Sequence, residues 1–209
     1  MLITYRFGKE PRNGGGLHLL QLAKFTAKKG HRYTIDAFKI ALENCPDMNL
    51  TFVGLDPWGI RSELLKQINN TPADGKVFFQ DSIDYKYLHE FMKDFQIFIH
   101  PSCYTEQMDC EGGAPIVLLD AQATGMPVIS TTHCDIPDEV LHQKTGLLSP
   151  EKDSASLAKS IEIFYQMGQN EYSLFAQEAR QHVEQNYDIK LNSSMLRTIY
   201  SELISIKNS

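Results

Sequence analysis

The chain has 209 residues, of which 42% are hydrophobic and 22% charged, a composition typical of a globular protein with a buried core. Its net charge of −6 argues against nonspecific nucleic-acid binding, because that requires a basic surface to neutralise phosphates. It contains no apolar run near the roughly 20 residues that span a bilayer, and its start shows no signal-peptide pattern, so we expect a cytoplasmic protein.

Residues 1–16 have the composition of a linker and end in three consecutive glycines, so we interpret them as a linker remnant. From residue 17 onward, short apolar runs alternate with amphipathic segments of helical spacing. The predicted strands span residues 17–25, 49–54, 76–80, 95–101 and 127–132. The predicted helices span residues 29–43, 60–70, 84–94, 115–125 and 138–143. Asp84 is expected to cap its helix, and Pro115 to occupy the first helical position of the next one.

Residues 146–150 are predicted to form a turn, and the chain from about residue 153 shows two or three helical patterns without a strand. Strands that alternate with helices indicate right-handed crossovers and a parallel sheet covered on both faces. We therefore predict an α/β fold over residues 17–209: a Rossmann-like parallel sheet with helices on both faces and a C-terminal helical extension. Ligands of such sheets bind outside the carboxyl ends of the strands. The loops to search are 24–31, 54–59, 80–84, 100–115 and 131–137.

The first candidate site is the segment KFTAKKGH, residues 24–31, which joins the first predicted strand to the first predicted helix. Lysines and a glycine before a helix N-terminus favour anion binding, because free backbone N–H groups and the helix dipole add to the side-chain charges. A solvated basic turn is the alternative interpretation, since clusters of this kind are common on protein surfaces.

The second candidate site is the segment EGGAPIVLLDAQATG, residues 111–125. Gly112 and Gly113 allow close backbone approach, and the helix expected at Pro115 offers free N–H groups. The carboxylates of Glu111 and Asp120 can accept hydrogen bonds from sugar or ribose hydroxyls. The alternative is a surface acid at 111 and a structural acid at 120. An aspartate in an otherwise apolar helix nevertheless needs a partner if it is buried.

Four segments of the chain, in order, resemble the motifs of the family-four retaining glycosyltransferases of the GT-B type (glycosyl transferases group 1). LLQLAKFTAKKGH resembles V-G-R-L-x-x-K-K-G, and FIHPS (98–102) resembles the strand-end motif V-x-P-S. EGGAPIVLLDAQATGMPVIST resembles the acidic signature E-G-x-P-x-x-L-L-E-A-x-A-x-G-x-P-V, and DIPDEVLHQKTGLL (135–148) resembles a segment that ends in G-L-L. The matches cover about residues 17–150. They imply the nucleotide-sugar-binding half of a GT-B fold.

The resemblance also implies roles for individual residues. Lys24 takes the place of an arginine that contacts the donor diphosphate, and Lys29 matches a lysine with the same role. Glu111 matches the acid that contacts the donor sugar, and Asp120 the acid that contacts the ribose hydroxyls. Glu111, Lys29 and Lys24 are the implied catalytic residues. The implied donor-binding residues are Lys24, Lys29, Glu111, Gly112, Gly113, Ala114, Pro115 and Asp120.

The chain departs from the family pattern at three points. Lysine replaces arginine at position 24, which removes bidentate recognition of a phosphate. Eight residues, 112–119, separate Glu111 from Asp120 where the family has seven. Asp120 is one carbon shorter than the usual glutamate, which reduces its reach.

The four cysteines show no CxxC spacing, which favours a reduced chain. A zinc site would have to be assembled from His100, Cys103, Cys110, His133 and Cys134. Because their spacing matches no standard structural pattern, we interpret the cysteines as small buried or loop residues and predict no metal site. The absence of a DxD motif in a suitable loop favours a metal-independent reaction, and no cofactor is expected besides the donor substrate.

The implied activity is transfer of a hexosyl group, with retention, from a nucleotide diphosphate sugar to a saccharide or lipid-linked acceptor in surface polysaccharide biosynthesis. The expected partners are the donor and an N-terminal acceptor domain outside this chain. Through that domain, the full-length enzyme is expected to associate peripherally with the inner face of the membrane. The isolated domain is expected to be inactive alone. Two alternatives stay open: a nucleotide-sugar epimerase of the same architecture and a non-catalytic nucleotide-binding module.

Overall fold

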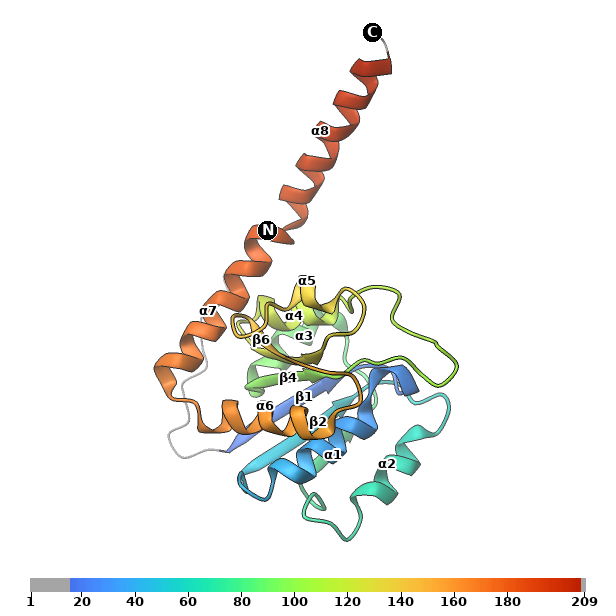
Figure 1. Cartoon of the computed structure of the whole chain (residues 1–209), viewed down its shortest axis with the longest axis vertical. Helices are drawn as coiled ribbons and strands as arrows, with labels where there is room; N and C mark the ends of the chain where they lie inside the picture. Colours follow the sequence, from blue (N-terminus) through green and yellow to red (C-terminus); the bar gives the residue numbers. More distant parts are fainter. Residues whose placement is uncertain (1–15, 208–209) are drawn as a thin grey trace.

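A computed structural model describes residues 16–207 of the chain (Figure 1). The strands are β1 (Leu17–Leu22), β2 (Met48–Val53), β3 (Val77–Gln80), β4 (Ile97–His100), β5 (Val128–Thr131) and β6 (Gly146–Ser149). The α-helices are α1 (His31–Ala41), α2 (Ile60–Ile68), α3 (Tyr85–Phe91), α4 (Val117–Ala123), α5 (Ile136–Glu139), α6 (Ser154–Gln166), α7 (Gln169–Asn186) and α8 (Ile189–Lys207). Two 3-10 turns, η1 (Ala27–Lys29) and η2 (Met92–Asp94), complete the described elements. Apart from Gly16, the predicted linker lies outside the described residues.

The six strands form one parallel sheet in the order β3-β2-β1-β4-β5-β6. This order confirms the predicted Rossmann-like α/β fold. The strand order reverses between β1 and β4, and the loops that follow these two strands diverge there. Ligands of open α/β sheets bind at such a switch point. The first and second candidate segments follow β1 and β4, so the topology brings both to the same place.

Two hydrophobic cores cover the two faces of the sheet, because alternate side chains of a strand point to opposite faces. Leu19, on one face, belongs to the core shared with α1 and α6. Its neighbour Leu20, on the other face, belongs to the core shared with α3 and α4. Figure 1 shows α1 and α6 on one side of the sheet and α3 and α4 on the other. The helices cover the two faces of the sheet, whereas the carboxyl ends of the strands are lined by loops.

The structure corrects the sequence-based prediction at three places. The predicted turn at 146–150 contains a sixth strand, β6, which pairs with β5. Its four residues are too few to show a strand pattern, and the flanking glycine and proline suggested a turn. The fourth helix begins at Val117, because Pro115 forms the turn before it and accepts a hydrogen bond from Leu118 N at 2.9 Å. Helix α5 ends at Glu139, so the helix predicted over 138–143 lies earlier in the chain.

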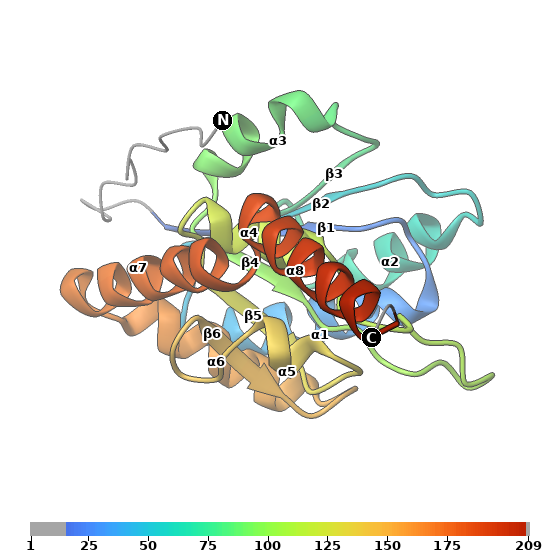
Figure 2. The same cartoon turned by 90° about the horizontal axis from the view of Figure 1, so that it is seen from above.

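Three helices follow the sheet, without a strand among the described residues after β6. Helix α6 packs against α1, and α7 packs against α4. Helix α8 continues away from the body of the domain (Figure 1), and in the view from above it lies in front of the sheet (Figure 2). Its apolar side chains are exposed, among them Ile199, Leu203 and Ile206. In the described part of the chain, no helix is both long and apolar enough to cross a membrane.

Candidate functional site at the switch point

A buried side-chain amide on β1 anchors the loop between β1 and α1 by hydrogen bonding. Gln21, on β1, donates from Nε2 to the backbone oxygen of Lys29 at 2.7 Å and accepts from Thr34 Oγ1 at 2.6 Å. Both side chains are fully buried. Gly30 has a φ of +69°, and a Cβ there would lie 2.0 Å from the backbone oxygen of Pro101. The loop therefore needs glycine at this position and is fixed against the end of β4.

This arrangement brings Lys29 and Glu111 into direct contact. Lys29 Nζ lies 2.7 Å from Glu111 Oε2, and the two side chains are 18% and 8% exposed. The second carboxylate oxygen of Glu111 accepts from Ser102 Oγ at 2.7 Å. His100 Nε2 lies 3.8 Å from that same oxygen, beyond hydrogen-bond distance. Two residues predicted independently from the first and second candidate segments thus form one ion pair.

A neighbouring lysine ties the two loops together beside this ion pair. Lys28 Nζ donates to Asp109 Oδ1 at 3.0 Å and to the backbone oxygen of Cys110 at 2.8 Å. The Asp109 side chain is 62% exposed, so this salt bridge contributes little to stability. The hydrogen bond to the Cys110 backbone fixes the position of the residue that immediately precedes Glu111.

The surroundings of Glu111 keep its carboxylate ionised. Burial raises its pKa, but contacts from His100, Lys29 and Ser102, together with the charge of Lys29, outweigh that effect and lower the pKa to about 2. Burial is also the main cause that lowers the pKa of His100, and the charge of Lys29 lowers it further. His100 is therefore neutral at pH 7. The site presents one paired carboxylate and one paired ammonium at the switch point.

The backbone after Glu111 makes a turn with free donors. Gly112 has a φ of +77°, a conformation that favours glycine. Within residues 16–207, the N–H groups of Gly112, Gly113 and Ala114 make no hydrogen bond. A Cβ at Gly113 would lie 3.7 Å from Asp135 Oδ2, and Ala114 packs against the core that covers α4. The turn can therefore offer N–H groups to an oxygen anion.

Asp120 lies apart from these groups, on the first turn of α4. Its Oδ1 accepts from the hydroxyl of Tyr85, at the start of α3, at 3.0 Å. Burial raises the pKa of Asp120, and the hydrogen bond from Tyr85 opposes that rise in part. Asp120 thus has a single hydroxyl partner and no cation among the described residues.

Lys24 is exposed and lies apart from the Lys29–Glu111 ion pair. Its Nζ lies 4.6 Å from the centre of the Trp58 ring, a cation–π contact. It lines a hollow of about 230 Å³ at the ends of β1 and β2, with Ser82 and Ile83 from the loop after β3. The structure therefore brings Lys29 together with Glu111, but it places Lys24 on the side of the loop that faces β2.

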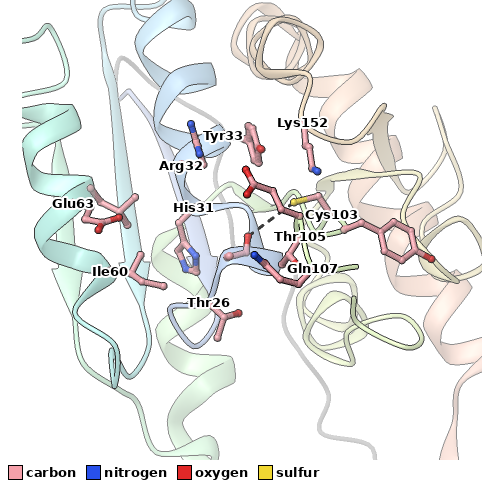
Figure 3. Close-up of a pocket in the computed structure, with 14 residues that line it drawn as sticks. Thr26, His31, Arg32, Tyr33, Ile60, Glu63, Cys103, Thr105, Gln107 and Lys152 are labelled. Carbon is pink, nitrogen blue, oxygen red and sulfur yellow. Dashed lines mark hydrogen bonds between the residues drawn. The ribbon is translucent and has the colours of Figure 1, made fainter. Parts of the chain in front are cut away.

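A larger cavity, of about 570 Å³, opens between the loop after β1 and the loop after β4 (Figure 3). Its walls come from the loop after β1 and the start of α1, from α2, and from residues 103–107. Arg32 and Lys152 line it, as does His31, whose pKa burial lowers to about 3. The cavity is lined by neither Lys29 nor Glu111.

Several partners of the candidate residues were not predicted. Ser102 and His100 lie in the FIHPS segment that carried part of the resemblance, and that strand-end motif was the available signal. Tyr85 and Trp58 contact Asp120 and Lys24 across the fold, and nothing in the local sequence indicates those pairs. Gln21 is a polar residue in an apolar strand, which is a signal that a buried partner exists.

Comparisons with known proteins agree with this architecture. The family model of the glycosyl transferases group 1 matches residues 5–182. WcaL of Escherichia coli (strain K12), whose name proposes a glycosyltransferase of colanic acid biosynthesis, is 29% identical over 188 residues. That match covers 90% of this chain and 45% of WcaL, so the chain spans about half the length of this relative.

Two solved structures share the fold. The C-terminal domain of the group 1 glycosyl transferase LpcC from Francisella tularensis superposes with a TM-score of 0.71 at 20% identity, covering 84% of this chain and 88% of that domain. HepE of Anabaena, crystallised with UDP, superposes with a TM-score of 0.76 at 22% identity, covering 90% of this chain and 49% of HepE. With its sheet order, its motifs and the family match over most of its length, the chain belongs to the glycosyl transferases group 1 family.

Proposed function

We propose that the chain is the donor-binding half of a retaining, metal-independent glycosyltransferase that transfers a hexosyl group from a nucleotide diphosphate sugar. The observation that carries the proposal is the Lys29–Glu111 ion pair at the switch point. It holds a cation and a carboxylate side by side, where a donor has an anionic diphosphate attached to a sugar that bears hydroxyls. Lys29 is assigned to the diphosphate and Glu111 to the donor sugar.

The diphosphate is expected to lie over the turn that follows Glu111. Hydrogen-bond donors and cations that point toward the charge developing on a leaving group stabilise the transition state. Lys29 supplies the cation, and the backbone N–H groups of Gly112, Gly113 and Ala114 supply hydrogen-bond donors. Lys24 adds a second cation once its side chain leaves the Trp58 ring, since it is exposed and has a flexible stem.

The nucleoside is expected to extend toward α3. Among residues 16–207, the Asp120 carboxylate has one hydrogen-bond partner, the exposed Tyr85 hydroxyl, so it can accept a ribose hydroxyl as well. The hollow of about 230 Å³ at the ends of β1 and β2 is the proposed place of the base. The HepE structure was solved with UDP, which makes UDP the first ligand to test.

The acceptor is proposed to bind in an N-terminal domain outside this chain, which would close the opposite wall of the cleft. Closure excludes water and positions the acceptor hydroxyl, contributions that reach several kcal/mol of barrier. The chain alone is therefore expected to bind the donor without transferring the sugar. Because WcaL is named for colanic acid biosynthesis, we propose a role in polysaccharide biosynthesis, with a saccharide or lipid-linked acceptor. We assign the full-length enzyme to the cytoplasm, associated with the inner face of the membrane through the N-terminal domain.

The test combines binding and turnover. Calorimetry with UDP, GDP and ADP, and with their sugars, should show that one nucleotide series binds the isolated chain. A longer chain that restores the N-terminal domain should transfer the sugar, with retention read from the anomeric proton by NMR. Failure of all three series to bind would contradict the proposal. Turnover by the 209-residue chain alone would contradict the assignment of the acceptor site.

A further inference from the structure

Three potential metal ligands meet beside the switch point. The ligand atoms of Cys110, His133 and Cys134 lie within 4.8 Å of one another. Cys110 comes from the long loop after β4, and the other two follow β5. The sequence alone predicted no zinc site, because the spacing of these residues matches no standard structural pattern. The fold nevertheless brings these three residues together, because β4 and β5 are neighbours in the sheet.

The separations are close to those of ligands around one zinc ion. With Zn–S near 2.3 Å and Zn–N near 2.0 Å, a tetrahedron places a sulfur and a nitrogen about 3.6 Å apart and two sulfurs about 3.8 Å apart. Cys134 Sγ lies 3.2 Å from His133 Nε2, and all pairs in the cluster fall within 4.8 Å. Side-chain movements of less than an ångström would accommodate the ion. Both cysteines are only partly buried, so an ion can reach them.

The histidine already has the tautomer that a metal requires. His133 Nδ1 lies 2.7 Å from Glu151 Oε1, and a carboxylate can only accept, so Nδ1 carries the proton. The lone pair is therefore on Nε2, the nitrogen that faces Cys134 and accepts from the backbone N–H of Glu111 at 3.3 Å. Metal-binding histidines characteristically donate their other N–H to a carboxylate in this way. His133 is fully buried, which fixes the direction of that lone pair.

From this geometry we propose a zinc site formed by Cys110 Sγ, His133 Nε2 and Cys134 Sγ. Two thiolates and one imidazole are ligands that suit Zn²⁺, and three protein ligands leave a fourth position for water. Cys134 has a φ of +46°, unusual for a residue other than glycine, and this backbone conformation accompanies the contact of its sulfur with His133. Glu151 is the positioning residue.

The zinc site is adjacent to Glu111 but separate from the proposed diphosphate site. Cys110 precedes Glu111 in the chain, and a metal on His133 Nε2 would take the lone pair that now accepts the Glu111 N–H. Lys29 and Ser102 hydrogen-bond to the Glu111 side chain and, within residues 16–207, to no side chain of Cys110, His133 or Cys134. The ion would therefore fix the loop that carries Glu111 without being part of the transfer reaction.

The test uses the whole chain, fully reduced and free of metal. Titration with Zn²⁺, followed by competition with a chromogenic chelator, should give one ion per chain. Titration with Co²⁺ should give thiolate-to-cobalt charge-transfer absorption and the visible bands of a tetrahedral ion. Cys110→Ser and Cys134→Ser should each lower zinc affinity more than about tenfold. Cys45→Ala, which changes a buried cysteine outside the cluster, should leave zinc affinity unchanged.

Glu151→Gln tests the positioning role, because an amide can present its NH₂ group to His133 and favour the wrong tautomer. It should lower zinc affinity about 10- to 100-fold and shift the pH dependence of binding. The proposal is overturned if the reduced chain binds no zinc stoichiometrically. It is equally overturned if cobalt shows no thiolate band, or if both serine variants, with melting temperatures like that of the parent, bind zinc as the parent does. These outcomes leave nucleotide binding, and with it the proposed function, unaffected.

Discussion

Glu111 and Asp120 are the two acids of one sequence motif, but the fold gives them opposite surroundings. Glu111 is paired with Lys29 and accepts from Ser102, and its pKa is lowered to about 2. Asp120 accepts a hydrogen bond from the Tyr85 hydroxyl, and burial raises its pKa. Glu111 therefore stabilises the folded chain in its ionised form, whereas ionised Asp120 opposes folding. Acids with similar implied roles toward a ligand can therefore differ in their contribution to the stability of the fold.

Removal of Lys29, the cationic partner of Glu111, should have the greatest effect on ligand binding. Lys29→Ala should weaken nucleoside-diphosphate binding about 10- to 100-fold, because a charge-assisted hydrogen bond contributes about 1.5–3 kcal/mol. Calorimetry would measure this. Lys39→Ala is the control and should leave nucleotide affinity unchanged, because Lys39 lies on α1 outside both loops, with its Nζ 3.8 Å from Asp36 Oδ1. Equal affinity in the Lys29 variant and the parent would make the ion pair purely structural.

The stabilisation by Glu111 should depend on pH. The pKa of Glu111 is lowered in the folded chain, so its stabilisation is fully present above its ordinary pKa of 4.5 and is lost as pH falls toward about 2. Comparison of urea unfolding for the parent and Glu111→Gln should show a difference of about 3 kcal/mol at pH 6 that disappears below about pH 2. A difference independent of pH would mean that the carboxylate charge is not what stabilises this loop.

Asp120→Asn should have the smallest effect on stability. Because burial raises the pKa of Asp120, its ionised form is disfavoured in the folded chain, and removal of the charge should change stability by at most about 0.5 kcal/mol at pH 7. Nucleotide affinity should fall about fivefold to tenfold, the effect of about one hydrogen bond. Binding of a 2′,3′-dideoxynucleotide should be unaffected by the substitution. If the variant weakens both ligands equally, Asp120 does not contact the ribose.

The sheet was predictable because its central strands are apolar runs separated by helices of clear periodicity. β6 was missed, since its four residues carry too little pattern, and the start of α4 was misplaced because Pro115 also suits the turn before a helix. In the site, the motifs indicated Lys29 and Glu111 individually, and the topology explains their contact. The pairing of Cys110 with His133 was not predictable, because it depends on neighbouring strands rather than on spacing along the chain.

The buried amide of Gln21 has a consequence for the thermodynamics of binding. By fixing the backbone oxygen of Lys29 from inside the sheet, it removes conformational entropy from the loop during folding rather than during ligand capture. A preorganised loop loses less freedom when an anion arrives, so more of the interaction energy appears as affinity. A change deep in β1, with no contact to the ligand, would accordingly be felt as weaker binding with a less favourable entropy.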